Sequence, residues 1–325
     1  MKKMIAALLS AALMLTAGCA SEQPAKDPAV SEQTSSATEP TAGEDTDDEL
    51  MQKFFEAHRC RNILEKHQNM EEHVVYFDAQ GNEVNSVYRY MDSEMQVWDN
   101  GTYLQLVYPD RWYERDPERS EKVTAFFAMD GIMEKEWEVL FNDYFDFHPD
   151  EEDEITGRDY SKEDGRITLT LACPATETSC PIPELWGEIE PGTQDILEVT
   201  IDSETYMPYE MFSYLKKTDG TTVRMYEGTF SYDVPTYTPS EEMLEVMNGT
   251  DNTLHLVADP GTEQERTYTI SCGKNGNPSI VLADGYNRRY RDAACTQEEL
   301  PSENLLGEPV ILITGEQTLY TVNES

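Results

Sequence analysis

The spacing of hydrophobic positions changes along the chain, and each spacing predicts a different kind of element. Leu50, Phe54, Ala57, Cys60 and Leu64 recur every three or four residues, which predicts an amphipathic helix over residues 47–68. After this helix, apolar and polar residues alternate in short runs rich in Val, Tyr and Trp, which is typical of antiparallel strands. These runs cover residues 72–78, 85–91, 95–99, 102–108, 122–129, 155–160, 166–172, 195–201, 209–217 and 222–233.

Turn signals separate the predicted strands. The Asn-Gly dipeptide at residues 100–101 and the Asp-Gly dipeptide at 219–220 favour the tight turns of antiparallel hairpins. Spacing is helical over residues 132–144, and Ser240 is a suitable N-cap for a short helix over residues 241–247. Further strand-like runs follow at 253–258, 266–271, 279–282, 286–291 and 310–314. The pattern therefore predicts a mainly β fold of the α+β class.

The start of the chain has the pattern of a bacterial export signal. Lys2 and Lys3 precede an apolar run over residues 5–15, which is too short to span a bilayer as a helix. The small residues after it end at Cys19 and resemble the lipobox of bacterial lipoproteins, although Thr16 occupies the position where a branched apolar residue is usual. The resemblance implies a signal peptide over residues 1–18, a lipid such as palmitate on Cys19, and a lipid-anchored location on the extracytoplasmic face of the cell membrane.

Composition distinguishes a tether from the folded part of the chain and disfavours anionic partners. Residues 19–46 contain no aromatic residue and many Ser, Thr, Glu and Pro residues, so we expect a disordered tether. The chain has 64 Asp and Glu against 24 Lys and Arg, a net charge of −40, which disfavours nucleic acid and anionic headgroups as partners. Most of this acidic surface is expected to keep an exported protein soluble.

The six cysteines suggest two disulfides, because an exported protein can keep them oxidised. If Cys19 carries the lipid, five cysteines remain, which is an odd number. Spacing makes two pairs plausible without proving them: Cys173 with Cys180, and Cys272 with Cys295. The fifth cysteine lies in the predicted N-terminal helix and is expected to be a small buried hydrophobic residue.

Motifs that carry catalysis are absent from the sequence. It contains no nucleophile elbow, no zinc-protease motif, no phosphate-binding Gly-rich loop and no Cys-x-x-Cys pair, and its five histidines are scattered. We therefore expect no catalytic residue, no metal site and no cofactor. Paired carboxylates of a glycoside hydrolase stay open as an alternative, but 64 acidic residues make that signal weak.

One stretch of the chain carries strand and turn signals in a distinctive order. Residues 197–208 read Leu-Glu-Val-Thr-Ile-Asp-Ser-Glu-Thr-Tyr-Met-Pro, and an Asp-Gly hairpin at 219–220, a closing strand at 230–234 and Pro239-Ser240-Glu241 follow. This order resembles the LolA-like lipoprotein carriers over residues 47–250. The resemblance implies an unclosed antiparallel β-barrel wrapped over an N-terminal helix, with an apolar cavity for acyl chains or another hydrophobic ligand. Residues 251–325 are then predicted to form a separate small β module.

Apolar residues occur on both faces of the predicted strands, so both faces need cover. A ligand cavity on one side and helices on the other would provide it, as would a packed sandwich or a filled barrel. The aromatic candidates for lining a cavity are Trp98, Tyr103, Trp112, Phe127, Phe212 and Tyr226. We favour an anchored, non-enzymatic protein that binds a hydrophobic or lipidated ligand. The alternatives are a surface scaffold that binds a protein or glycan partner, and a carboxylate-dependent hydrolase.

Overall fold

The computed structural model describes residues 45–129, 137, 154–161, 165–176, 186 and 188–324. Its helices are α2 (Asp47–Ala57), α3 (Cys60–Lys66) and α6 (Glu241–Asn248). Its strands are β1 (Asn69–Phe77), β2 (Glu83–Asp92), β3 (Gln96–Asp99), β4 (Leu104–Val107), β5 (Arg111–Arg115), β6 (Val123–Ala128), β7 (Glu154–Ser161), β8 (Arg166–Pro174), β9 (Gln194–Asp202), β10 (Pro208–Lys216), β11 (Thr222–Tyr232), β12 (Asn252–Ala258), β13 (Arg266–Cys272), β14 (Gly276–Val281), β15 (Ser302–Glu303), β16 (Pro309–Val310) and β17 (Glu316–Thr321).

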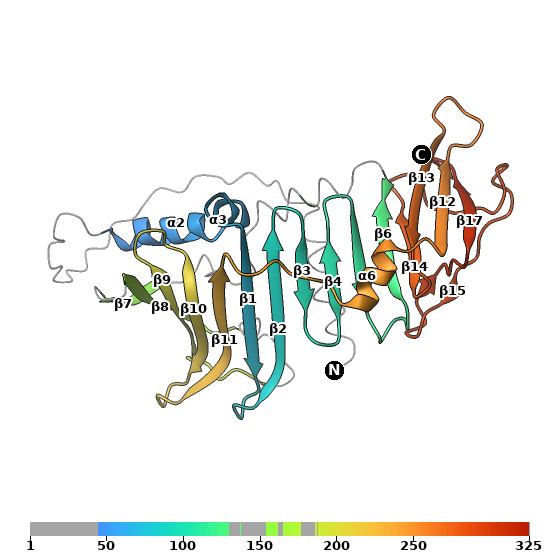
Figure 1. The fold of residues 1–325 in the computed structure, drawn as a ribbon. Coiled ribbons are helices and arrows are strands. Elements are labelled where there is room, and N and C mark those ends of the chain that lie inside the picture. The colour runs from blue at the N-terminus through green and yellow to red at the C-terminus, as the bar shows by residue number, and fades with distance from the viewer. Residues whose placement is uncertain are drawn as a thin grey trace, which may run out of the picture.

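Most strands belong to one large sheet of 12 strands, in the order β14-β6-β5-β4-β3-β2-β1-β11-β10-β9-β8-β7 (Figure 1). Neighbouring strands are antiparallel throughout except for β14 and β6, which are parallel. The edge strands β14 and β7 lie at opposite ends, so the sheet is not closed into a barrel. A second sheet has the order β13-β12-β17, and β15 pairs with β16.

Helix α2 begins at a capping box. The Thr46 hydroxyl accepts the Glu49 backbone N–H at 3.3 Å, and the Glu49 carboxylate accepts the Thr46 N–H at 2.9 Å, which satisfies two exposed donors of the first turn. The prediction of one helix over residues 47–68 is wrong, because Arg59 has extended backbone angles and separates α2 from α3. This break lets residues of both helices, Phe54 and Ile63 among them, face the same part of the sheet.

The first hydrophobic core lies between these two helices and one face of the sheet. Buried side chains of α2 and α3 pack there with side chains of β1, β2 and β8 to β11, namely Leu50, Phe54, Ala57, Cys60, Ile63, Met70, Met91, Leu169, Leu171, Leu197, Val199, Ile201, Met211 and Phe230. Polar contacts hold the start of α2 over the far end of the sheet. Arg158 of β7 pairs with Asp47, and the Tyr206 hydroxyl donates to Asp45 at 2.9 Å.

A second core lies on the opposite face, over the other half of the sheet. The chain after β11 crosses that face to reach α6 and then β12 (Figure 1). Side chains from β2 to β6 pack there with those of the C-terminal elements, namely Tyr90, Val97, Leu104, Leu106, Tyr113, Val123, Ala125, Met243, Val246, Leu254, Leu256, Ile270, Ile280 and Leu319. Residues 251–325 therefore share their core with earlier strands, and β14 extends the large sheet. The predicted module with a core of its own does not match this arrangement.

Most strands before residue 250 and the last helix lie close to their predicted ranges. Ser240 caps α6 as predicted, accepting the Met243 N–H at 3.3 Å. Strands β5, β15 and β17 fall outside the predicted ranges. Residues 286–291 are not a strand, and only Val310 of the predicted run 310–314 belongs to one, β16. Of the predicted helical segment 132–144, only Trp137 is described, and it is helical. The predicted signal peptide, Cys19 and the tether up to residue 44 lie outside the described residues.

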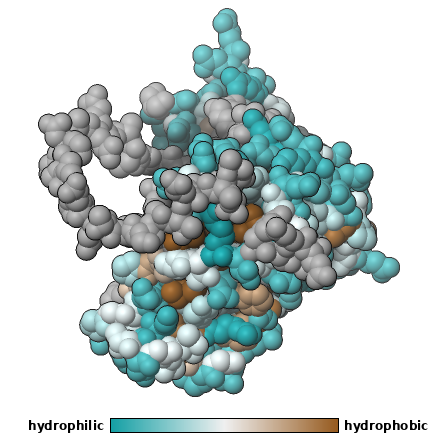
Figure 2. All heavy atoms as spheres, turned by 90° about the vertical axis from the view of Figure 1, so that its left-hand side faces the viewer, coloured by the Kyte–Doolittle hydropathy of each residue, from teal (hydrophilic) through white to brown (hydrophobic). Residues whose placement is uncertain are grey.

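The end of the molecule formed by α2 and β7 is mostly hydrophilic among the residues shown, and hydrophobic residues reach its surface only in small separate patches (Figure 2). None of the described helices is long and apolar enough to cross a membrane.

Candidate functional site

The half of the large sheet that carries the second core also has a face that the core does not use. We call the face of β3 to β6 and β14 that points away from the second core the open face. Alternation along each strand assigns its residues, because successive side chains point to opposite faces. On β4, for example, Leu104 and Leu106 are buried in the second core, whereas Gln105 and Val107 point the other way and are partly exposed.

Strand register arranges the open face in two rows that cross five strands. One row is Trp98, Gln105, Glu114, Thr124 and Asn277, in which each residue is the register partner of the next. The neighbouring row is Gln96, Val107, Trp112, Phe126 and Ser279. All of these side chains except Asn277 are partly exposed. A largely polar row therefore runs beside a row with an apolar and aromatic centre.

Aromatic contacts connect several side chains of this surface. The rings of Trp112 and Phe126 are stacked, with centroids 4.4 Å apart and an interplanar angle of 7°. Trp98 meets Tyr103 edge-on at 5.2 Å between centroids. Tyr103 is held in place by the β3–β4 turn, where the Asn100 side chain accepts its backbone N–H at 2.7 Å. Aromatic pairs of this kind contribute about 0.5–1.5 kcal/mol beyond what area burial does.

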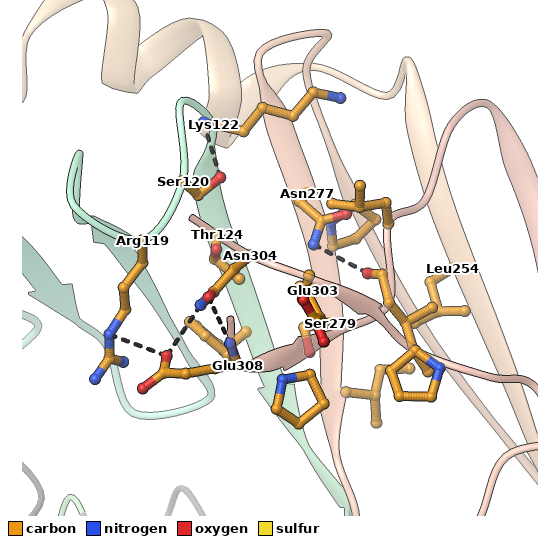
Figure 3. Close-up of a pocket in the computed structure, with 18 of the residues that line it drawn as sticks. Arg119, Ser120, Lys122, Thr124, Leu254, Asn277, Ser279, Glu303, Asn304 and Glu308 are labelled. Atoms are coloured by element: carbon orange, nitrogen blue, oxygen red, sulfur yellow. Dashed lines mark hydrogen bonds and ion pairs between the residues drawn. The ribbon is translucent and has the colours of Figure 1, made fainter. Parts of the chain in front are cut away.

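The open face continues into a pocket of about 890 Å³ at the β14 end of the sheet (Figure 3). Glu114, Thr124, Phe126 and Ser279 bring the two rows into this pocket, and residues of the segment 287–312 line it as well. Asn277 connects β14 to the segment that follows β16. Its side-chain amide donates to the Ile311 carbonyl at 3.2 Å, and its side-chain oxygen accepts the Ile313 N–H at 2.9 Å.

Arg119 forms ion pairs with three carboxylates at the pocket. Its guanidinium nitrogens lie 3.7 Å from Glu114, 3.4 Å from Asp116 and 3.5 Å from Glu308. Burial raises the pKa of Glu114 above its ordinary value, although the nearby Arg119 charge favours the ionised form. Burial, followed by the negative charge of Glu114, also raises the pKa of Tyr103, so its hydroxyl stays neutral and can hydrogen-bond Glu114.

The structure brings together only some of the six predicted cavity residues. Trp98, Tyr103 and Trp112 share the open face. Phe127 points to the opposite side and packs against the second core, Tyr226 packs against the first core, and Phe212 is 36% exposed on the outer side of β10. Phe127, Phe212 and Tyr226 therefore do not lie on the open face with the other three candidates, whereas Phe126, which was not a candidate, does.

The predicted disulfide between Cys272 and Cys295 is not formed. Cys272 and Cys295 are both free, and Cys272 is buried beside Gly276. Burial raises the pKa of the Cys272 thiol to about 11. Cys173 lies in β8, and its predicted partner Cys180 lies outside the described residues, so this pairing stays a prediction. Within the described ranges there is no cluster of three or more His, Cys, Asp or Glu residues that could hold a metal ion.

Neither a family model nor a curated protein matches this sequence. Among solved structures, the chain is similar to the crystal structure of LprF from Mycobacterium bovis, with 14% identity and a TM-score of 0.27 over 59% of this chain and 97% of that chain. It is also similar to a DUF1329 family protein from Desulfovibrio piger ATCC 29098, with 11% identity and a TM-score of 0.24 over 58% of this chain and 95% of that chain.

Proposed function

We propose that this protein is a lipid-anchored, extracytoplasmic binding protein without catalytic activity, and that its open face holds a hydrophobic or lipidated ligand. The observation that carries the proposal is the row Val107, Trp112 and Phe126. These side chains are partly exposed, lie side by side in register and lead into the pocket. Apolar surface that is presented beside a pocket is typical of ligand-binding sites.

The architecture supports this location for the ligand over the one that the LolA-like resemblance implies. In that resemblance the ligand lies between the curved sheet and its helices. Here that space is occupied by the first core, where Leu50, Phe54 and Ile63 are each 1% exposed. The open face is the continuation of the same sheet face beyond the helices. Met91 of β2 belongs to the first core, and its register partner on β3 is Gln96, which lies on the open face.

Attachment to a membrane through Cys19 is consistent with binding of a hydrophobic ligand. The lipobox resemblance at Cys19 implies a protein fixed to one membrane, which fits a receptor or sensor of a hydrophobic ligand rather than a shuttle. The net charge of −40 favours a ligand without excess negative charge. At about 25 cal/mol per Å², covering some 200 Å² of apolar surface would contribute about 5 kcal/mol before the costs of association.

Native mass spectrometry of the chain from residue 19 onward, with Cys19→Ser to prevent acylation, tests this proposal. We expect an adduct of lipid mass that organic extraction removes, and that is lost or reduced in Trp112→Ala. Phe212→Ala is the matched control, because it removes an exposed aromatic ring from the other side of the sheet. A chain without any adduct that also fails to bind added fatty acid would contradict the proposal, as would equal loss in both variants.

A glycan is the second candidate ligand, and the polar row supports it. Gln105, Glu114 and Thr124 offer hydrogen-bonding groups next to Trp98 and Trp112, and sugars are bound by aromatic rings flanked by such groups. Binding of soluble oligosaccharides to the same Cys19→Ser chain, with no extractable lipid, would favour this candidate over the first.

A further inference from the structure

Exposed leucines are concentrated in one short segment of the chain. We call residues 300–312, which include β15 and β16, the leucine hairpin. Leu300 is 74% exposed, Leu305 63%, Leu306 44% and Leu312 53%. These are four of the six large hydrophobic side chains that are exposed among the described residues. A contiguous exposed apolar patch with a polar border is typical of an interaction site, whereas single exposed leucines are not.

The hairpin holds its leucines in a defined conformation. The Asn304 side-chain oxygen accepts the backbone N–H groups of Leu306 and Glu308, each at 2.9 Å, and Gly307 has a positive φ of 78° that suits glycine. The Asn304 N–H donates to the Glu308 carbonyl at 2.8 Å. The Leu305 N–H donates to the Arg119 carbonyl at 3.0 Å, which fixes the turn to the rest of the molecule. Rigid presentation lowers the entropy cost of docking.

The charge around the hairpin is negative. Glu298, Glu299, Glu303 and Glu308 lie in or next to it, and the sequence contains no Lys or Arg after Arg291. Three of these carboxylates have arginine partners: Glu308 with Arg119, Glu298 with Arg288 and Glu299 with Arg291. Glu303 is exposed in β15. The apolar patch is therefore bordered by carboxylates on a chain whose net charge is −40.

We propose that the leucine hairpin docks a basic amphipathic peptide segment of a partner protein. The hairpin adjoins the open face of the proposed function, because Leu305 and Leu312 also line the pocket at the end of that face. Apolar side chains of the partner would cover Leu305, Leu306 and Leu312, and its Lys or Arg side chains would meet the border carboxylates. Charge favours a basic peptide over two other molecules that could cover the leucines, namely a second copy of this chain and an anionic membrane. A second copy of this chain would bring another 40 negative charges, and an anionic membrane surface would be repelled as well.

Synthetic peptides measure this specificity directly. The probe is a fluorescein-labelled 12-residue peptide of Lys-Leu-Leu-Lys repeats, with Lys-Ser-Ser-Lys and Glu-Leu-Leu-Glu peptides of the same length as controls. Anisotropy is measured with the chain from residue 19 onward carrying Cys19→Ser. We expect the first peptide to bind at least tenfold more tightly than either control, because the site needs both apolar and basic side chains.

Two variants locate the binding on the hairpin. The double substitution Leu305→Ser and Leu306→Ser should weaken binding of the Lys-Leu-Leu-Lys peptide about tenfold or more, since it removes two apolar anchors. Val84→Ser, which changes another exposed apolar residue far from this turn in the sequence, should leave the affinity unchanged. Unaltered circular dichroism and thermal melting of both variants show that the fold is kept.

Three results would overturn the proposal. Equal affinity of the wild-type chain for the Lys-Leu-Leu-Lys and Lys-Ser-Ser-Lys peptides would mean that charge alone acts. Equal affinity of the wild-type and double-variant chains would place the binding elsewhere. Co-sedimentation of the Cys19→Ser chain with phosphatidylcholine vesicles, lost in the double variant, would identify a lipid surface as the occupant instead.

Discussion

Leu256→Ala tests whether the C-terminal elements and the earlier strands share one core. Leu256 of β12 is fully buried and belongs to the second core together with side chains of β3 to β6. Truncating a buried leucine costs about 3–5 kcal/mol, from the lost transfer free energy and the cavity left behind. With a urea m-value of about 3 kcal/mol per M, the unfolding midpoint should fall by about 1–2 M.

Tryptophan fluorescence makes the assay selective. All four tryptophans, Trp98, Trp112, Trp137 and Trp186, precede residue 250. A background of Trp137→Phe and Trp186→Phe leaves two reporters, in β3 and β5, on the strands that contribute to the second core. We therefore expect Leu256→Ala to lower the midpoint of the fluorescence transition, although the substitution lies in the C-terminal region.

The matched control is Val257→Ala on the same strand. Val257 is the register partner of Thr267 and points away from the core, so we expect a loss below about 1 kcal/mol. An unchanged fluorescence midpoint in Leu256→Ala, with a separate earlier transition seen by far-UV circular dichroism, would refute the shared core and restore an independent module over residues 251–325.

The remaining predictions concern polar groups. Arg89→Met should destabilise the chain by about 3–5 kcal/mol in urea unfolding, because it removes the counter-ion 3.4 Å from the fully buried Glu72 carboxylate. The double variant Arg89→Met and Glu72→Gln should lose clearly less stability. Equal losses in the single and double variants would contradict this reasoning. The hydrogen bond from His67, at 2.8 Å, lowers the pKa of Asp233. The stability that Asp233 contributes is therefore present above the unfolded-state pKa near 4 and is lost as the pH falls through the folded-state value, so Asp233→Asn should flatten the loss of stability between about pH 4 and pH 2. Asn100→Ala should cost about 1 kcal/mol in thermal unfolding, because its side chain accepts two backbone N–H groups of the β3–β4 turn.

Local patterns predicted the hairpins well because their signals are local. Gly101 and Gly220 both have positive φ, as the Asn-Gly and Asp-Gly dipeptides indicate. The turn after residue 201 is also built by nearby groups, since the Asp202 carboxylate accepts the N–H groups of Glu204 and Thr205 at 2.9 and 2.7 Å. The stretch that carries the LolA-like resemblance is thus the end of β9 and the turn that leads into β10.

The composition of the open face could not be predicted to the same extent, because it depends on register. Trp112 meets Phe126 only through the pairing of β5 with β6, and β5 was missed because Arg111-Trp112-Tyr113-Glu114-Arg115 is short and highly charged. Without that pairing, the cross-strand contact that distinguishes Phe126 from Phe127 could not be seen. Since side chains alternate with a period of two, choosing the neighbour placed the candidate on the wrong face. The small residues at Val123 and Ala125, alternating with Phe127 toward the core, were the available signal.

Apolar residues on both faces of the strands have one explanation in this sheet, which is that its two halves are covered on opposite sides. The change occurs at β2, where consecutive residues are both buried: Tyr90 belongs to the second core and Met91 to the first. Beyond β2 the helices α2 and α3 no longer cover the face of Met91, and Trp98, Val107 and Trp112 continue that face. Their partial exposure follows from this change of cover, because the same sheet face that is core under α2 and α3 becomes an accessible apolar surface over β3 to β6. A sheet that is covered on opposite sides of its two halves therefore leaves a partly exposed apolar surface without a closed cavity.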